Sequence, residues 1–494
     1  MKREYLPLES LPAWLRLNGI SSNGVAFQRF GSADNATDKG SAIVATQDKC
    51  SKESDALPEV LLQIPSDLLL SLDTVLDYSK SDQNLREVLE AVGEFGRTAR
   101  GAIMVFFLIQ MTHSSPDTPR SIGVSNPWTE YIKFLPSSFP LPTSYSEQER
   151  ELLKGTSLAA LVEAKITSLE QEFDYLRKAT ENIAWCRQCW WNEDGGSLTF
   201  HDWVYTDAAY RSRMVDLPRR GHAMVPCIDM ANHVSGESVK ALYDADAEGN
   251  AILQLRWGQS LRPGDEVTIS YGDEKSASEM VFSYGFLEND RTEAKQAILD
   301  IKVPDDDPLG VAKRMICQEA PGVRVSDTPE SNPITRAGIV WEGPLIWWAS
   351  VNEEDGLHIG VAQTTDGRRE LETTWRDKKI QSPHQLRELL ATDPLWDIFQ
   401  LRAIVLVLQR LETQLSLLQE TEEALLNIQD QALLDSMFRP EVFSLLSRLR
   451  KYETVLLERA VEQLMKQRNE LMESDTVVAY LNQQSQADED EDFS

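Results

Sequence analysis

The sequence has few cysteines, no long apolar run and no recognisable targeting segment. Five cysteines among 494 residues are too few, and odd in number, for a disulfide framework. The longest apolar run, residues 102–109, is far shorter than the ~20 residues that a membrane-spanning helix needs. The N-terminal residues 1–10 lack an apolar core of signal-peptide length. We therefore expect a soluble chain in a reducing compartment, cytoplasmic and/or nuclear, with no membrane partner.

Positive charge is also scarce. Lys and Arg total 49 against 79 Asp and Glu, which gives a formal net charge of −30. A broad basic face for gripping nucleic acid is therefore excluded, and no direct nucleic-acid partner is expected. The 41% hydrophobic fraction excludes wholesale disorder. Such acidity serves solubility in many proteins, and it also attracts basic partners.

Several catalytic motifs are missing. The chain has no G-x-S-x-G, no G-x-x-x-x-G-K-[ST] and no G-x-G-x-x-G, so the motifs of hydrolases, kinases and dinucleotide enzymes are lacking. Cys186 and Cys189 form a C-x-x-C pair, but a structural zinc site needs four ligands and no second pair exists. We interpret the pair as buried free cysteines beside tryptophans and predict no metal.

What is present is an alternation of strand-rich and helix-rich zones. Period-two runs at 41–45, 60–65, 251–257 and 266–271 predict strands on both sides of a helical zone, about 73–191. Because strands flanking an insert usually share one folded unit, we expect an α+β chain. Its predicted parts are a β-rich domain over 11–286, an all-α domain over 287–474 and a disordered acidic tail over 475–494.

The all-α prediction depends on two apolar stripes near the C-terminal end. Leu408, Leu411, Leu415 and Leu418 step by three and four residues, as the core-facing side of a helix does. A second such stripe covers residues 449–464. Because Pro440 interrupts the pattern, we expect a helical bundle and not a free coiled coil.

Two segments stand out as candidates for a site. Residues 224–233 read as an apolar strand that ends in Asp229, Asn232 and His233. Residues 264–272 read as a strand that ends in Tyr271 and Gly272. Taken singly, Asn-His at a strand end is usually a turn and Tyr-Gly a common strand end, so neither segment alone indicates a function.

Together the two segments closely resemble the SET-domain protein methyltransferases, in which such segments meet in a pseudoknot-like crossing. Residues 126–136 resemble the S-P-W-x-x-Y-x-x-x-L-P segment of the Rubisco large-subunit methyltransferase-like branch. The resemblance implies a SET domain with a helical insert and a C-terminal helical substrate-binding domain. It also implies S-adenosyl-L-methionine as cofactor and no metal.

The resemblance assigns cofactor-binding roles residue by residue. It implies that backbone groups of three residues contact the amino-acid end of the cofactor and that an arginine in the segment Arg211-Ser212-Arg213 pairs with its carboxylate. It implies that the Asn-His pair holds the adenine and methionine moieties and that a phenylalanine packs on the adenine. The residues concerned are Gly40, Ser41, Ala42, Arg213, Asn232, His233 and Phe286, and Tyr271 is assigned to the cofactor site as well.

The same resemblance assigns catalysis to Tyr271, while Asp229 and Tyr284 would border the channel that admits the target side chain. An in-line methyl transfer needs alignment and a neutral nucleophile, which suits an apolar, aromatic channel. The expected activity is protein-lysine N-methylation of a non-histone protein, such as a basic ribosomal protein or translation factor. A protein-histidine methyltransferase and a non-catalytic SET-fold binding module remain alternatives, and we expect a monomer.

Overall fold

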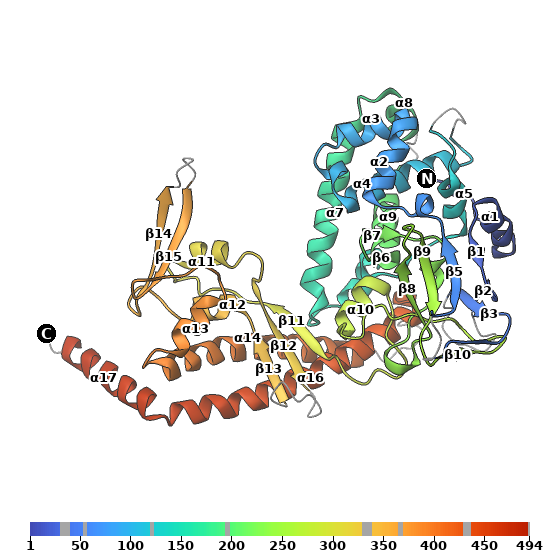
Figure 1. Cartoon of the computed structure of the whole chain (residues 1–494). Helices are drawn as coiled ribbons and strands as arrows, with labels where there is room; N and C mark the ends of the chain where they lie inside the picture. The colour runs from blue at the N-terminus through green and yellow to red at the C-terminus, as the bar shows by residue number, and fades with distance from the viewer. Residues whose placement is uncertain are drawn as a thin grey trace. The chain divides into compact units, whose positions relative to one another are not determined.

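The computed structural model describes residues 1–29, 40–52, 57–118, 123–192, 198–328, 338–363, 369–427 and 436–492. They form two compact units, both drawn in Figure 1. Unit 1 comprises Met1–Ser146, Leu161–Lys275 and Glu279–Glu288, and unit 2 comprises Glu147–Ala160, Ser276–Ser278 and Asn289–Ser494. The chain passes from unit 1 into unit 2 for the last time after Glu288. The domain boundary expected from the sequence is at residue 286.

Unit 1 contains small antiparallel sheets and a helical insert. Its largest sheet has the order β1-β5-β9-β8. The strands are β1 (Ser21–Ser22), β2 (Val25–Arg29), β3 (Ser41–Ala45), β4 (Lys49–Cys50), β5 (Val60–Ile64), β6 (Met214–Leu217), β7 (Gly221–Met224), β8 (Ala241–Ala245), β9 (Ala251–Leu255) and β10 (Ser260–Leu261). The helices are α1 (Leu11–Leu17), α2 (Leu72–Ser81), α3 (Gln83–Ala91), α4 (Ala99–Ser114), α5 (Pro127–Tyr131), α7 (Leu158–Thr180, entering the unit at Leu161), α8 (Ala184–Cys189), α9 (Phe200–Arg213) and α10 (Ala277–Tyr284). The predicted strand at 266–271 forms only isolated bridges.

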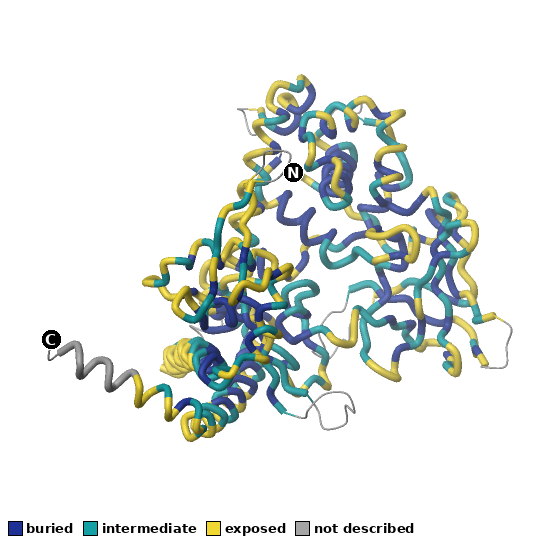
Figure 2. Tube along the Cα trace, turned by 60° about the vertical axis from the view of Figure 1, so that its left-hand side comes forward, coloured by how far each residue is buried: buried dark blue, intermediate teal, exposed yellow. Residues whose placement is uncertain are grey.

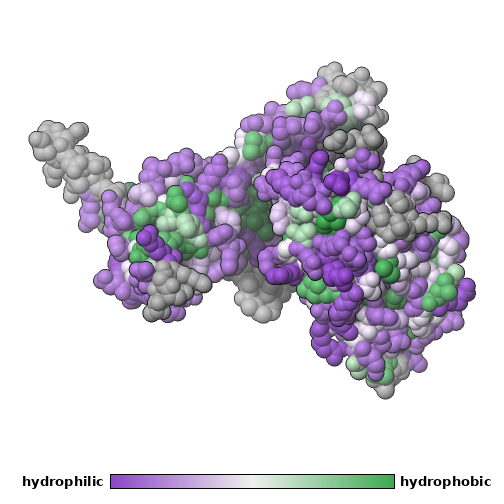
Figure 3. All heavy atoms as spheres, turned by 90° about the horizontal axis from the view of Figure 1, so that it is seen from above, coloured by the Kyte–Doolittle hydropathy of each residue, from purple (hydrophilic) through white to green (hydrophobic). Residues whose placement is uncertain are grey.

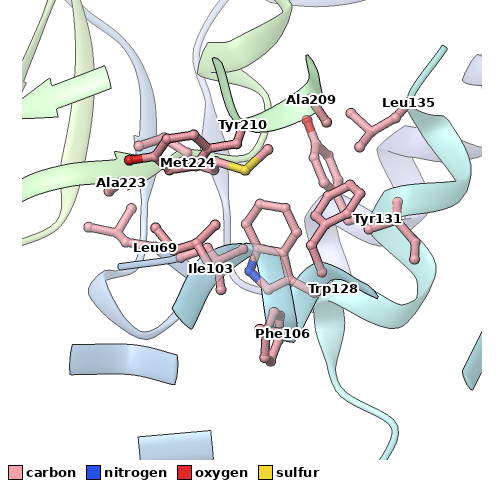
Figure 4. Close-up of a cluster of buried hydrophobic side chains, with 14 of the residues drawn as sticks. Leu69, Ile103, Phe106, Trp128, Tyr131, Leu135, Ala209, Tyr210, Ala223 and Met224 are labelled. Carbon is pink, nitrogen blue, oxygen red and sulfur yellow. The ribbon is translucent and has the colours of Figure 1, made fainter. Parts of the chain in front are cut away.

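The core of unit 1 joins the sheets to the insert. Helix α4 is buried on every side from Gly101 to Thr112, as its unbroken apolar run predicts (Figure 2). Trp128 packs among side chains that include Phe106 and Tyr131 (Figure 4), and its indole N–H donates to the Leu68 carbonyl at 3.0 Å. Helix α5 begins where it does because Asn126 caps its first turn. Because Trp128 is anchored in the core, the position of Tyr131 in the same helix is fixed as well.

Unit 2 is not all-α, which corrects the sequence-based prediction. Its strands are β11 (Gln296–Asp300), β12 (Gly322–Thr328), β13 (Gly338–Glu342), β14 (Leu357–Gln363), β15 (Arg369–Trp375) and β16 (Lys378–Lys379), in two antiparallel three-stranded sheets. Its helices are α6 (Glu147–Glu151), α11 (Gly310–Ile316), α12 (Pro344–Ala349), α13 (Gln385–Ala391), α14 (Trp396–Leu426), α16 (Pro440–Met472) and α17 (Asp475–Asp492). The α+β class is nevertheless confirmed.

The two long helices of unit 2 are those that the apolar stripes predict. Helices α14 and α16 lie side by side (Figure 1), and α16 begins at Pro440, where proline is tolerated because the first helical N–H has no partner to lose. The predicted disordered tail is wrong at its start. Helix α17 begins at Asp475, and Val477 is buried because this helix packs against α14 and α16.

A buried polar cluster fastens the segment Glu147–Ala160 to the long helices within unit 2. The Arg450 guanidinium donates to the carbonyls of Leu152, Lys154 and Leu418 at 3.3, 2.6 and 2.6 Å. The Glu453 carboxylate accepts from the Ser157 N–H at 2.7 Å and from its hydroxyl at 2.5 Å. Burial raises the pKa of Glu453 to about 7, although the Ser157 donors and Arg450 oppose that rise.

Cys186 and Cys189 are both buried on α8, and neither forms a disulfide with a described residue, which agrees with the interpretation of the C-x-x-C pair as buried thiols. On the face shown in Figure 3, polar side chains dominate and apolar ones form scattered patches. Within the described part of the chain, no helix combines the length and apolarity needed to span a bilayer.

The buried Glu453 makes the stability of unit 2 depend on pH. Because the folded-state pKa is raised, the native state keeps a proton that the unfolded state has lost, so stability falls as pH rises from about 4.5 to about 7. The loss is on the order of 3 kcal/mol, since one pKa unit corresponds to about 1.4 kcal/mol. We expect Glu453→Gln to flatten this slope, measured by hydrogen exchange of α16 amides across the window.

The matched control for that measurement is Glu458→Gln, because Glu458 is an exposed carboxylate on the same helix. Glu458→Gln is expected to keep the pH slope of the native protein. Equal slopes for Glu453→Gln and the native chain would show that the carboxyl titrates alike in both states.

Candidate active site

The two candidate segments lie side by side in unit 1. The Ile269 N–H donates to the Asn232 carbonyl at 2.9 Å, and the Val234 N–H donates to the Ile269 carbonyl at 3.1 Å. These bonds make a parallel bridge between His233 and Ile269. The sequence prediction that these segments meet is therefore confirmed in geometry. Between Met224 and Met230, however, the predicted strand is a turn and a short 3₁₀ helix, Ile228–Met230.

Strand β3 lies against the second segment through its middle residues. The Val267 N–H donates to the Ile43 carbonyl at 2.8 Å, and the Ala45 N–H donates to the Asp265 carbonyl at 2.9 Å. Gly40, just before β3, has φ of +75° with open space where a Cβ would point. The predicted cofactor residues Gly40, Ser41 and Ala42 thus stand at the entry of a strand that is anchored to the crossing.

The phenol of Tyr271 is held in a fixed place. Its hydroxyl donates to the Ala231 carbonyl at 2.8 Å, and its ring stacks on His233 with centroids 5.0 Å apart. Burial raises the pKa of Tyr271 well above its ordinary value, opposed by Arg213 and aided by Tyr284. At physiological pH the group is therefore a neutral hydrogen-bonding phenol and not a phenolate base.

Two further aromatic residues complete this enclosure. The Tyr284 ring lies 4.5 Å from the Tyr271 ring between centroids, and the Phe286 ring lies 6.4 Å away in an edge arrangement. Burial raises the pKa of Tyr284 to about 12, so its hydroxyl is also neutral. Tyr271, Tyr284 and Phe286, all assigned to the site by the resemblance, therefore form one aromatic cluster.

His233 connects this cluster to the crossing. Its ring Nδ1 accepts from the Tyr271 N–H at 3.0 Å, so the ring proton is assigned to Nε2. Nε2 lies 3.2 Å from the Glu288 carboxylate and 3.2 Å from the Ser235 hydroxyl. The imidazole thus contacts the main chain of Tyr271 as well as its ring.

Asn232 is held by a carboxylate. Its side-chain amide donates to Glu266 Oε1 at 2.6 Å, while its main-chain carbonyl accepts from Ile269. The amide is thereby oriented by a residue of the opposite segment, which positions it for the predicted cofactor role.

Arg213 ends helix α9 and points to Asp229. One guanidinium nitrogen donates to the Asp229 carbonyl at 2.7 Å and to its carboxylate at 3.1 Å. The other carboxylate oxygen accepts from the Tyr131 hydroxyl at 2.5 Å, and that hydroxyl accepts from the Cys227 N–H at 2.7 Å. Cys227 has φ of +73°, an uncommon left-handed conformation that this bond helps to hold.

The structure therefore differs from the predicted role of Asp229. Its side chain is only 1% exposed and is engaged by Arg213 and Tyr131, so it positions the arginine and does not line an open channel. Burial raises the pKa of Asp229, while Arg213 and the Tyr131 hydroxyl oppose the rise. Arg211, close by in sequence, instead binds the Phe282 carbonyl at 2.6 Å and Thr143 at 2.9 Å.

Sequence reasoning missed four side chains that support the site: Tyr131, Ser235, Glu266 and Glu288. Tyr131 lies in the segment 126–136 and Glu266 in the segment 264–272, both of which the sequence singles out. Neither segment, however, indicates what these two side chains do. Ser235 and Glu288 carry no sequence signal beyond closeness to His233 and Phe286. Lys39, which precedes Gly40 in the sequence, lies outside the described residues.

One feature of this structure indicates that the residues of the site suit the predicted cofactor. Arg213 Nε is buried and has no hydrogen-bond partner among the described residues. A buried donor without a partner costs free energy, and a carboxylate would satisfy it. Arg213 thus offers a donor suited to the carboxylate of S-adenosyl-L-methionine.

The solved Rubisco LSMT structure bound to AdoMet superposes with a TM-score of 0.58 over 94% of this chain and 93% of that one, at 16% identity. The LSMT SET domain bound to MeLysine and AdoHcy gives 0.57 over 95% and 94%, also at 16% identity. The chain has a SET fold of the Rubisco LSMT type. This confirms both the resemblance and the fold class that the sequence predicts.

The curated relatives are distant in sequence. SET domain-containing protein 8 of Schizosaccharomyces pombe is 25% identical over 430 residues, which are 86% of this chain and 90% of that protein. The actin-histidine N-methyltransferase of Homo sapiens is 22% identical over 311 residues, 60% of this chain and 45% of that enzyme. No family model matches the chain.

The bond between Tyr131 and Asp229 can be tested by removing one hydroxyl. Tyr131→Phe leaves a buried carboxylate oxygen and the Cys227 N–H without this partner. We expect the free energy of unfolding to fall by about 2 kcal/mol or more, since unsatisfied buried groups cost that much. Denaturant unfolding measures the change, with Tyr5→Phe as control because Tyr5 is 46% exposed. Equal losses in both variants would contradict the inferred role.

Proposed function

We propose that the chain is an S-adenosyl-L-methionine-dependent protein-lysine N-methyltransferase that acts on a non-histone protein. The observation that carries the proposal is the neutral Tyr271 phenol, bound to the Ala231 carbonyl within the aromatic cluster of Tyr284 and Phe286. The AdoMet- and AdoHcy-bound LSMT structures, which share this fold, support the cofactor.

The residues of the site suit that chemistry. The cofactor, when bound, supplies a methyl group on an electrophilic sulfonium. Arg213 would bind its carboxylate, and Asn232 and the main chain of His233 would hold its other polar groups. A free lysine has pKa ~10.4, and an apolar enclosure favours its uncharged, nucleophilic form. The Tyr271 hydroxyl and the Ala231 carbonyl would orient the amine and the methyl group.

The substrate is proposed to be a protein with a basic surface. The net charge of −30 favours such a partner through long-range attraction. Basic ribosomal proteins and translation factors fit this description, and they would place the enzyme in the cytoplasm or nucleus. A monomeric enzyme is proposed.

A histidine acceptor is the second candidate. It is favoured by the 22% identity to the actin-histidine N-methyltransferase. Both acceptors present a nitrogen nucleophile to the same aromatic cluster. Labelled methyl transfer into a lysate that lacks this protein, followed by mass spectrometry, identifies the methylated side chain. Methyllysine supports the first proposal and methylhistidine the second.

The role of Tyr271 is tested by Tyr271→Phe, which keeps the stacked ring and removes the hydroxyl bond to Ala231. We expect methyl transfer to slow by about 10²-fold or more, the size found when one oriented polar group is lost. Cofactor affinity, measured by calorimetry, should stay nearly constant because the phenol acts on alignment.

The control for Tyr271→Phe is Tyr78→Phe. In the native chain the Tyr78 hydroxyl donates to the Asp67 carbonyl at an exposed position. Unchanged methylation by Tyr271→Phe would reject its catalytic assignment. Cofactor binding by the native chain without methyl transfer to any protein would instead favour a non-catalytic binding module. Absence of cofactor binding would reject the proposed function itself.

A further inference from the structure

The environment of His233 points beyond cofactor binding. The side chain is 0% exposed, and each ring nitrogen has an assigned partner. Nδ1 accepts from the Tyr271 N–H at 3.0 Å, the imidazole stacks on the Tyr271 ring, and the Phe286 ring is tilted to it with centroids 6.2 Å apart. The orientation of the imidazole and the place of Tyr271 are therefore coupled through both a hydrogen bond and ring stacking.

The other side of the imidazole is fixed by two oxygens. Nε2 donates to Glu288 Oε1 at 3.2 Å, and the Ser235 hydroxyl donates to the same carboxylate oxygen at 3.0 Å. The Glu288 side chain is 11% exposed, so the carboxylate acts where water screens little. Glu288 is the last residue of unit 1 before the chain enters unit 2.

We propose that Glu288, aided by Ser235, is a positioning residue for methyl transfer. It holds the His233 proton on Nε2, which leaves Nδ1 free to accept from the Tyr271 N–H and so fixes the catalytic tyrosine. The wrong tautomer would place a proton on Nδ1 against the Tyr271 N–H, two donors facing each other. The chain Glu288–His233–Tyr271 thus maintains the alignment of the phenol without contact between Glu288 and the reacting atoms.

The proposal rests on the proposed function only for its kinetic test. The first experiment measures the tautomer of His233 and therefore requires no substrate. Imidazole ¹⁵N resonances of the full chain report which ring nitrogen carries the proton. For His233 in the native chain we expect a single Nε2–H form. In Glu288→Ala we expect a mixture of tautomers, and in Glu288→Gln, whose amide oxygen can still accept, the single form restored. A single Nε2–H form in Glu288→Ala would overturn the proposal, whatever the activity.

The second experiment is kinetic. In Glu288→Ala we expect kcat to fall about tenfold or more, the size that carboxylates behind functional histidines contribute, with the cofactor Kd changed less than about threefold. Glu288→Gln should recover most of kcat. Glu237→Gln is the control, since Glu237 is an exposed carboxylate two residues from Ser235.

The two experiments separate the possible failures. If the native chain transfers no methyl group, the proposed function fails and the tautomer of His233 still tests the positioning role. Equal kcat in Glu288→Ala and the control would overturn the catalytic part of the proposal. A loss of kcat that Glu288→Gln does not recover, with the tautomer unchanged, would show a merely structural role and would overturn it as well.

Discussion

The site depends on the main-chain pairing of Asn232–Val234 with Ile269. Two hydrogen bonds across this crossing bring together residues that lie 38 positions apart, such as His233 and Tyr271. The contacts between the two segments assume that pairing. The hydroxyl of Tyr271 reaches Ala231, and its N–H reaches the imidazole, only because the two segments run parallel here. Main-chain hydrogen bonds do not depend on side-chain identity. The crossing therefore keeps the two segments in place, and their side chains provide the chemistry.

Three carboxylates then orient the three polar residues assigned to the cofactor. Asp229 binds Arg213, Glu266 binds Asn232, and Glu288 contacts His233. Hydrogen bonds to a charged carboxylate are stronger than those between neutral groups. Each one reduces the rotamer freedom of a long or rotatable side chain before any ligand arrives, so less ordering remains to be done on binding. The site is therefore preorganised by acids that need not touch the reacting atoms.

This arrangement explains what the sequence could predict about the site. Tyr271, Asn232 and His233 lie in short contiguous motifs whose residue types carry the resemblance. Tyr131 supports Asp229 from 98 positions away, and Glu288 reaches His233 from 55 positions away, so no local pattern indicates either contact. The burial of Asp229 could not be predicted for the same reason. Its place near the site could be predicted from its segment, but its contact with a tyrosine distant in sequence could not.

The same distinction between local and distant information accounts for the fold of unit 2. Helices α14 and α16 were predictable because their apolar stripes repeat along one continuous segment. The sheets were missed because strand pairing lies between segments, and some strands, such as β14 and β15, bury only one and two of their seven residues and so lack a clear alternation. In β12 the alternation is present, since Val323 and Val325 are buried and Arg324 is exposed, but seven residues within a helix-rich region carry little weight. Helix α17 shows the converse: an acidic composition predicts disorder, yet Val477 is buried and the Tyr480 hydroxyl accepts from Arg402 of α14 at 3.0 Å, so the start of the helix is bound to its neighbours.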